Sequence, residues 1–353
     1  MASEAEIQLP IIDISSATAE VGKQVIDAAR QYGFLYIDTA SSCFSKEEID
    51  STFKMAQEFF ASPIEEKKEV EIRSDNMGWT AMHKETLDPE HQQVPTILSI
   101  VKAINFGEFK NNKANQPLPK SLVPHEDNLN RFTSLCQKTC ARILTLLALG
   151  LDIPDNWFSS RHDPSHGPSG STLRFLYYPS LRCPSTQSFQ HGVDVRAGAH
   201  SDYGSITLLF QRDGQPGLEI LTLAGTWAGV PVRPAGVSTS ASLAPPILVN
   251  IGDLLSYWTR GVLKSTVHRV VFAKGEEEES EGRDRYSIVY FCHPCHDTEL
   301  VAVPSNIVEE VGKGKDTGEG TEMVEEKVVT AGEHLASRLA ATYGRSVGAY
   351  HRD

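Results

Sequence analysis

The stretch AGAHSDYGSITLLF, residues 197–210, places two ionisable side chains, His200 and Asp202, just ahead of an apolar run. The run from residue 206 contains β-branched and aromatic residues and predicts a β-strand. Residues two apart in an extended chain share a face, so His200 and Asp202 would point the same way. Such a pair is costly inside a protein when it has no partners. The two side chains therefore either face water or bind something.

A second histidine could complete a metal site with this pair. His268 lies in LKSTVHRVV, residues 263–271, which also predicts a strand. Two imidazoles and one carboxylate that leave other coordination positions open are typical of non-haem Fe(II) oxygenases. A surface His200–Asp202 pair together with an unrelated core histidine would produce the same pattern. Spacing alone leaves both interpretations open.

A third motif follows in RYSIVYF, residues 285–291, where Arg285 and Ser287 are again two residues apart. On one face of a strand, a guanidinium fork and a hydroxyl are suited to binding a carboxylate group. The alternative is a surface arginine beside an incidental serine. The motif favours a site that recognises a carboxylate.

Short strands dominate the second half of the chain. They are separated by Gly, Pro and Asp turns, and we expect them in the segments 171–179, 205–210, 217–221, 247–259, 265–272 and 285–294. Such spacing is typical of a sandwich or a barrel. Two polar, acidic or glycine-rich segments, 273–285 and 305–327, are expected to be solvated loops.

Helical periodicity dominates the first half and returns near the end of the chain. We expect helices over 17–33, 45–62, 125–151 and 332–343, a short helical turn after Pro63, and strands over 9–15 and 34–39. Ser45 and Glu48 have the spacing of a capping box. Residues 74–120 lack periodicity and predict loops and short strands. The expected fold class is mainly β with flanking helices.

The composition argues against two classes of partner. Asp and Glu number 46 against 33 Lys and Arg, which gives a formal net charge of −13. An acidic surface disfavours nucleic acids and anionic membranes. We therefore expect a small-molecule substrate, with no nucleic-acid partner and no membrane partner, and we expect the protein to be a monomer.

Targeting signals and cysteine usage point to one compartment. The first residues, MASEAEIQLPIID, have neither the basic region nor the apolar region of a signal peptide, and no apolar run reaches the length of a membrane span. The six cysteines of a chain of 353 residues are then expected to be reduced thiols. We expect a cytoplasmic protein.

Taken together, these motifs resemble a known family. HSDYGSITLLFQ, GDLLSYWTRGVLKSTVHRVV and RYSIVYFCHP are similar to the iron(II)/2-oxoglutarate-dependent dioxygenases of the isopenicillin-N-synthase-like group. In the first half, LPIIDIS, GFLYI, FFASPIEEKKEV, NMGW and NFGEF also resemble that group. The resemblance covers roughly residues 9–300 and the RLAATY segment near the end. The chain looks most like the thymine-dioxygenase-like enzymes and the small-molecule hydroxylases of microbial natural-product pathways.

The resemblance implies a double-stranded β-helix, or jelly roll, wrapped by helices. Residues 1–120 would form the N-terminal region, and residues 121–353 the catalytic core with a long support helix and a C-terminal helix. Fe(II) would be held by His200, Asp202 and His268. The reaction would consume 2-oxoglutarate and O2, release succinate and CO2, and oxidise a C–H bond of the substrate, most simply by hydroxylation.

The resemblance also implies a co-substrate site. Arg285 and Ser287 would hold the C5 carboxylate of 2-oxoglutarate, and Tyr178 in LRFLYYP would support it. Many relatives carry an Asn where this chain has Leu176, which puts one co-substrate contact in doubt. The residues FLYY also have high β-strand propensity, whatever their function.

Substrate contacts are expected from Arg174, Tyr203 and Phe291. Arg174 shares a strand face with Tyr178 and would then face the same cavity. A structural carboxylate, such as Asp194 or Glu219, is the alternative partner for Arg174. Loops around 74–110 and 182–199 are expected to line the pocket, because loops carry specificity.

Two other functions remain as alternatives. One is a non-haem iron oxidase of the same fold that does not use 2-oxoglutarate. The other is a non-catalytic jelly roll that binds a small molecule, for which the loss of a metal ligand would be expected. The sequence does not identify the substrate.

Overall fold

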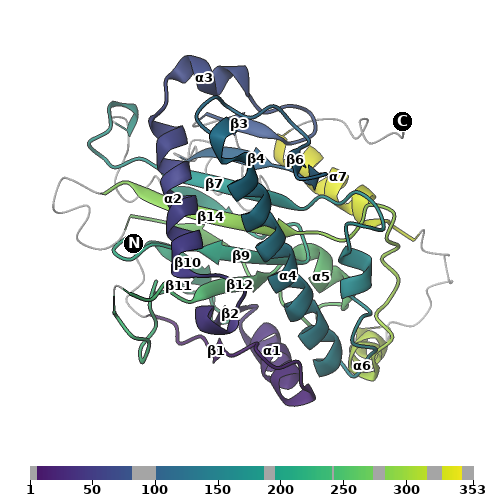
Figure 1. Ribbon diagram of the computed structural model, residues 1–353. Helices are drawn as coiled ribbons and strands as arrows, with labels where there is room; N and C mark the ends of the chain where they lie inside the picture. The colour runs from purple at the N-terminus through teal and green to yellow at the C-terminus, as the bar shows by residue number, and fades with distance from the viewer. Residues whose placement is uncertain are drawn as a thin grey trace.

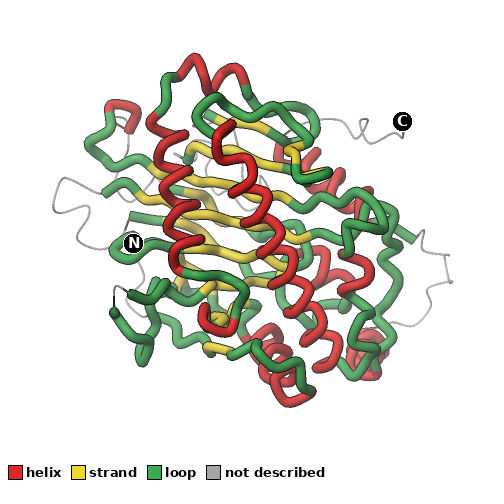
Figure 2. The backbone as a smooth tube through the Cα atoms, in the orientation of Figure 1, coloured by secondary structure: helices red, strands yellow, loops and turns green. Residues whose placement is uncertain are grey.

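The computed structural model describes residues 6–81, 101–186, 195–240, 242–272, 283–315 and 328–343. Within these residues most strands belong to two sheets (Figures 1 and 2). The larger sheet has the order β1-β2-β12-β9-β14-β7-β4-β3 and the smaller one β11-β10-β13-β8. β5 and β6 form a separate two-stranded ribbon.

The strand bounds are as follows. The larger sheet consists of β1 (Ile11–Ile12), β2 (Phe34–Ile37), β3 (Gly78–Thr80), β4 (Lys102–Phe106), β7 (Thr172–Tyr178), β9 (Ile206–Phe210), β12 (Ile247–Ile251) and β14 (Arg285–Cys292). The smaller sheet consists of β8 (Ala197–His200), β10 (Leu218–Leu221), β11 (Trp227–Gly229) and β13 (His268–Val270). The ribbon consists of β5 (Phe109–Lys110) and β6 (Lys113–Ala114).

The two sheets share one apolar core. Side chains of the larger sheet such as Leu176, Leu248 and Val289 belong to the same buried cluster as Ile220 and Val270 of the smaller sheet. Because side chains alternate along a strand, every second residue of β7 and β14 points to this cluster. The larger sheet therefore packs one face against the smaller sheet.

Helices cover the opposite face of the larger sheet. In Figure 1, α2 and α4 cross in front of its strands. Phe175 of β7 and Ile288 of β14 join a second buried cluster with Phe59 of α2 and Ile143 of α4. The helices are α1 (Ala19–Gln31), α2 (Lys46–Ala61), α3 (Ile64–Glu69), α4 (Glu126–Gly150), α5 (Asp253–Trp258), α6 (Asn306–Lys315) and α7 (Ala331–Tyr343).

Local signals explain where the long helices begin. Ser45 caps α2, and the reciprocal bond from the Ser45 backbone to Glu48 completes a capping box. Thr18 caps α1 by accepting from the backbone of Val21. The capping box predicted from the sequence is confirmed.

Two sequence predictions are wrong. Segment 247–259 is not one strand, because α5 begins directly after Gly252 and buries Leu254, Leu255 and Trp258 at helical spacing. Segment 305–327 is not entirely a loop, because residues Asn306–Lys315 form α6 and Val308 packs into the core.

The expected loop over 273–285 and the expected strand over 285–294 overlap at Arg285. The structure confirms the strand, because Arg285 is the buried first residue of β14. Residues 273–282 lie outside the described part of the chain.

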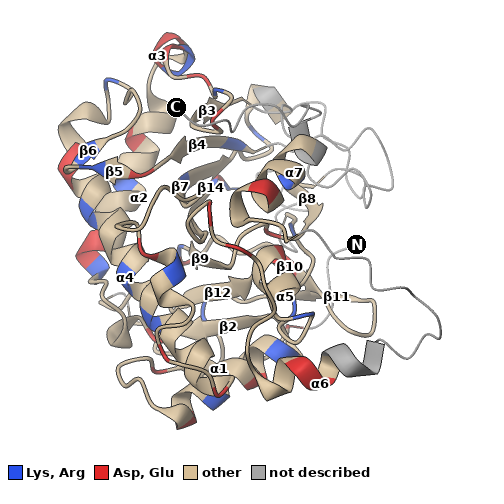
Figure 3. Cartoon of the chain, turned by 90° about the vertical axis from the view of Figure 1, so that its right-hand side faces the viewer, with Lys and Arg blue, Asp and Glu red and all other residues tan. Residues whose placement is uncertain are grey.

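Charged side chains lie mostly on helices and loops, and both signs occur along α4 (Figure 3). No helix in the described ranges is long and apolar enough to cross a membrane.

Candidate metal centre and substrate cavity

Strand pairing brings the three predicted ligands together. His200, the last residue of β8, lies directly opposite His268, the first residue of β13. Asp202 follows β8 by two residues, and its Oδ1 atom lies 3.9 Å from Nε2 of His200 and 3.8 Å from Nε2 of His268. The three ligand atoms lie within 4.8 Å of one another. The side chains form a face that could bind one metal ion.

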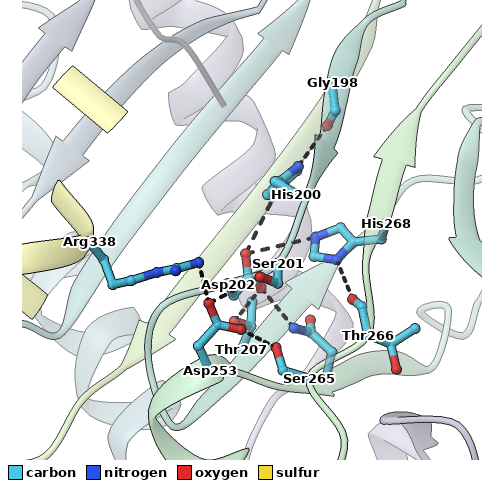
Figure 4. Close-up of polar contacts among 11 residues, drawn as sticks. Gly198, His200, Ser201, Asp202, Thr207, Asp253, Ser265, Thr266, His268 and Arg338 are labelled. Atoms are coloured by element: carbon cyan, nitrogen blue, oxygen red, sulfur yellow. Dashed lines mark hydrogen bonds and ion pairs between the residues drawn. The ribbon is translucent and has the colours of Figure 1, made fainter. Parts of the chain in front are cut away.

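Backbone carbonyls orient both imidazoles (Figure 4). The Nδ1 atom of His200 lies 2.8 Å from the carbonyl of Gly198, and Nδ1 of His268 lies 3.1 Å from the carbonyl of Thr266. A carbonyl can only accept, so each Nδ1 carries the proton. Each Nε2 is then left as a lone-pair donor, which is the arrangement usual for metal-binding histidines.

The carboxylate of Asp202 is oriented from the larger sheet. Its Oδ2 atom accepts from Oγ1 of Thr207 and from Nδ2 of Asn250, both at 2.7 Å. Thr207 lies in β9 and Asn250 in β12, and both are buried. These bonds leave Oδ1 on the side of the two imidazoles.

The backbone behind Asp202 is packed without room for a side chain. A Cβ atom on Gly252 would lie 2.2 Å from the carbonyl oxygen of Gly204 and 3.0 Å from that of Asp202. The backbone amide of Asp253 also donates to the Asp202 carbonyl at 2.7 Å. The segment that carries the carboxylate is therefore held against the start of α5.

The protonation states of Asp202 and His200 are suited to binding a cation. Burial raises the pKa of the Asp202 carboxyl, but the imidazoles of His268 and His200 and the two hydrogen bonds lower it, and the net pKa lies below the ordinary value. Burial, and after it the neighbouring imidazole of His268, lower the pKa of His200 to about 4. At neutral pH, Asp202 is ionised and His200 is neutral, as metal ligands must be.

The donor set fits Fe(II). Two imidazole nitrogens and one carboxylate oxygen on a single face are the protein ligands of non-haem Fe(II) oxygenases, whose remaining positions take other ligands. The second oxygen of Asp202 and both Nδ1 atoms already have hydrogen-bond partners, so the three convergent atoms are those left for a metal.

Arg285 and Ser287 lie together on the face of β14 that points toward the smaller sheet. Arg285 is 2 % exposed, and its Nη1 atom donates to Oγ of Ser287 at 2.7 Å. Its Nε atom lies 3.2 Å from the carbonyls of Gln215 and Pro216. Tyr178 lies opposite Arg285 in the sheet, and the guanidinium is 5.0 Å from the Tyr178 ring. The structure thus groups the three residues predicted for the co-substrate.

A cavity of about 310 Å³ opens beside the metal centre. His200, Asp202 and Tyr178 line it, whereas Arg285 and Ser287 are buried and do not belong to the lining. The three residues predicted to contact substrate, Arg174, Tyr203 and Phe291, all line the same cavity. Its volume is at the lower end of small-molecule sites.

The expectation for the lining loops is met in part. Residues from both ends of the segment 74–110 line the cavity, among them Met77 and Glu108, while residues 82–100 lie outside the described chain. From 182–199 the lining includes Ala197, which lies in β8. Glu219, considered as a partner of Arg174, forms a salt bridge with Arg269.

Several residues of the site were not predicted from the sequence. Asn250 is the polar residue inside the apolar run ILVNI, and a buried amide in such a run is a signal that could have been followed. Thr207, Leu335 and Leu339 have no comparable signal. Leu335 and Leu339 come from α7 and form part of the cavity wall.

Known proteins share both halves of this architecture. A family model described as "non-haem dioxygenase in morphine synthesis N-terminal" matches residues 9–126, and one described as "2OG-Fe(II) oxygenase superfamily" matches residues 169–294. The UPF0676 protein C1494.01 of Schizosaccharomyces pombe is 34% identical over 96% of this chain and 94% of its own. The 2-oxoglutarate-dependent dioxygenase htyE of Aspergillus rugulosus is 29% identical over 89% of this chain and 90% of its own.

Solved structures show the same relationship. A full-length Neurospora crassa protein, crystallised in complex with alpha-KG and thymine, superposes with a TM-score of 0.74 at 27% sequence identity. The match covers 96% of this chain and 98% of that protein.

Proposed function

Because the chain belongs to the 2OG-Fe(II) oxygenase superfamily, we propose that it hydroxylates a C–H bond of a small molecule and that His200, Asp202 and His268 hold the iron. The enzyme is a 2-oxoglutarate-dependent dioxygenase whose cofactor is Fe(II) and whose co-substrates are 2-oxoglutarate and O2. The observation that carries the residue assignment is the convergence of one Oδ1 and two Nε2 atoms within 4.8 Å.

Bound Fe(II) supplies the oxidation, in which 2-oxoglutarate and O2 become succinate and CO2 and one oxygen atom enters the substrate C–H bond. The protein contributes the geometry. Thr207 and Asn250 hold the Asp202 carboxylate in one orientation, and its other oxygen would be a ligand of the iron. The Gly198 and Thr266 carbonyls do the same for the imidazoles.

Arg285 and Ser287 bind the distal carboxylate of 2-oxoglutarate in this proposal, with Tyr178 beside them. A buried guanidinium next to a hydroxyl is suited to binding a carboxylate such as that of 2-oxoglutarate. This arrangement supports the 2-oxoglutarate-dependent reaction over the oxidase alternative.

Arg174, Tyr203 and Phe291 contact the substrate. Together these three residues bring one cationic group and two aromatic rings to the cavity, which suits a ring that carries a carbonyl, enolate or carboxylate. Thymine, the ligand in the Neurospora crassa complex, is one such ring. Substrates of nucleobase, amino-acid or secondary metabolism all fall within this class.

Further expectations belong to the same proposal. The two sheets form a jelly roll, and the domain boundary lies between residues 120 and 121. The enzyme acts as a cytoplasmic monomer without a nucleic-acid partner.

Succinate formation tests the proposed reaction. Purified protein with Fe(II), 2-oxoglutarate and O2 is screened across nucleobases, cyclic amino acids and aromatic polyketides, and succinate and hydroxylated product are measured together. We expect equal amounts of both with at least one substrate, and none with Asp202→Ala. Product without succinate would support the oxidase alternative.

Arg285→Met tests the co-substrate site. Loss of a charge-assisted contact, about 1.5–3 kcal/mol, should raise the KM for 2-oxoglutarate about ten- to a hundredfold. Arg131→Met is the control, because Arg131 is an exposed helix residue paired with Glu48 away from the cavity. An unchanged KM in Arg285→Met would contradict the assignment.

A further inference from the structure

The carboxylate of Asp253, the first residue of α5, receives hydrogen bonds from three separate segments (Figure 4). Its Oδ1 atom accepts from Oγ of Ser265 at 2.6 Å. Its Oδ2 atom accepts from Oγ of Ser201 at 3.0 Å and from Nη2 of Arg338 at 2.6 Å. One carboxylate therefore joins three parts of the chain that are far apart in sequence.

Two of these contacts reach the segments that carry the metal ligands. Ser201 lies between His200 and Asp202. Ser265 precedes Thr266, whose carbonyl orients His268. A shift of Asp253 would therefore be transmitted to both ligand-bearing segments.

The third contact reaches α7, which forms part of the cavity wall. Leu335 and Leu339 of α7 line the cavity, and Arg338 between them pairs with Asp253. The guanidinium of Arg338 also lies 5.0 Å from the ring of Tyr203, another lining residue. The residue that pairs with Asp253 thus sits at the point where α7 meets the cavity.

The residues that α7 packs against leave little free space around it. A Cβ atom on Gly170 would lie 2.3 Å from Cδ2 of Leu335, and one on Gly332 would lie 3.0 Å from Nδ1 of His296. The backbone amide of Gly332 also donates to the carbonyl of His296 at 3.0 Å. Gly170 and His296 line the cavity, so displacement of α7 would open the cavity wall.

An isolated exposed ion pair would not support a functional role, because such pairs contribute little. The side chain of Asp253 is only 18% exposed, whereas that of Arg338 is 37% exposed. Moreover, the two serine hydroxyls share the Asp253 carboxylate with Arg338, so loss of one bond changes the geometry of the others.

We propose that Asp253 is a positioning residue that couples the docking of α7 over the substrate cavity to the geometry of the metal centre. The proposal rests on the iron site assigned above. In this arrangement, metal binding steadies the Ser201 and Ser265 segments, which hold Asp253 in place for Arg338. Because such coupling is reciprocal, release of α7 weakens metal binding by the same factor.

The test uses the full-length protein freed of metal, with Co(II) alone as the probe. Amide hydrogen exchange of residues 331–343 is measured with and without Co(II), and Co(II) affinity is measured by titration. We expect Co(II) to slow exchange in α7 of the unaltered protein. In Arg338→Met this slowing disappears and Co(II) affinity falls about five- to tenfold, while Arg338→Lys restores part of both.

Matched variants separate coupling from general destabilisation. Arg131→Met breaks a comparable ion pair on α4 and should leave the slowing and the affinity unchanged. Ser201→Ala and Ser265→Ala should each weaken the slowing while α7 and Arg338 are intact. These variants keep the Asp253 carboxylate itself, so the test does not depend on a substitution at Asp253.

The outcomes distinguish a failure of the proposed coupling from a failure of the iron-site assignment. If Co(II) binds the unaltered protein but exchange in α7 does not change, or if Arg338→Met keeps the full slowing, the coupling is refuted. If Co(II) does not bind, or binds equally well to Asp202→Ala, the iron site itself is wrong.

Discussion

Asp202 uses its two carboxylate oxygens differently. Oδ2 is held by Thr207 and Asn250 from the larger sheet, and Oδ1 faces the imidazoles of the smaller sheet. A buried carboxylate that accepts two hydrogen bonds is preorganised, so binding a metal requires little movement. The charge of a single residue is in this way held between the two layers of the fold.

Thr207→Val should weaken metal binding about ten- to a hundredfold, because it removes one of the two donors that orient Asp202 while keeping nearly the same shape. Co(II) or Fe(II) titration measures the effect. Thr222→Val is the control, since the Thr222 hydroxyl bonds to Thr226 on an exposed turn. Equal affinity of the Thr207 variant and the unaltered protein would show that Asn250 alone orients the carboxylate.

At the scale of elements, α1 and α4 cross at two glycines. A Cβ atom on Gly150 would lie 2.3 Å from the carbonyl oxygen of Gly22, and one on Gly22 would lie 2.7 Å from the carbonyl oxygen of Leu146. The backbones can approach closely because neither glycine has a side chain. Since α4 packs against the larger sheet, this crossing fixes α1 relative to the strands that position Asp202.

Gly150→Ala should lower the free energy of unfolding by about 1–3 kcal/mol, although alanine is the better helix former. The added methyl group meets backbone atoms, which cannot move aside as a side-chain tip can. Urea unfolding measures the change.

Gly22→Ala should have a similar effect. The double variant should be less destabilised than the sum of the two single variants, because one displacement of α1 relieves both clashes. A Gly150→Ala protein as stable as the unaltered one would mean that the helices can separate without cost.

Across the whole molecule, buried neutral histidines make the fold sensitive to acid. Burial, helped by the neighbouring charge of Arg161, lowers the pKa of His162 to about 4. Burial and, to a smaller extent, the neighbouring side chains of His162, His334 and His296 lower the pKa of His293 to about 3. His162 bonds to Ser205 and lies beside the ring of Trp258, and His293 packs against Gly170 and Gly204, so charging either side chain would disturb the packing around it.

Stability should fall as the pH drops from 6.5 toward 4. In the unfolded chain these histidines bind protons near pH 6.5, whereas in the folded protein they bind them only near their lowered pKa values. The unfolded state therefore binds more protons within this window, and at pH 5 each histidine costs on the order of 2 kcal/mol of unfolding free energy.

Urea unfolding at pH 7 and pH 5 checks this dependence. In His162→Gln, the free energy of unfolding should differ less between pH 7 and pH 5. The reduction should equal about the contribution of one histidine, because glutamine does not titrate. Equal stability of the unaltered protein at both pH values would contradict the assignment of these side chains as neutral in the folded state.

Local sequence rules predicted much of the fold and the residues of the candidate site. The spacing of two residues placed Arg285 and Ser287 on one face of a strand, as the register of β14 confirms, and the Ser45–Glu48 pattern marked the start of α2. These predictions succeed because they depend on neighbours in the chain. Helix periodicity, capping and strand alternation are all properties of a few consecutive residues.

Tertiary structure alone decided the rest. The pairing of His200 with His268 follows from the register of β8 and β13, and Asn250 reaches Asp202 because β12 lies beside β9. The link between Asp253 and Arg338 joins residues 85 positions apart. No local rule brings such residues together, because their contact depends on how sheets and helices close around a shared core. The sequence thus determined which residues could do the chemistry, and packing determined which of them meet.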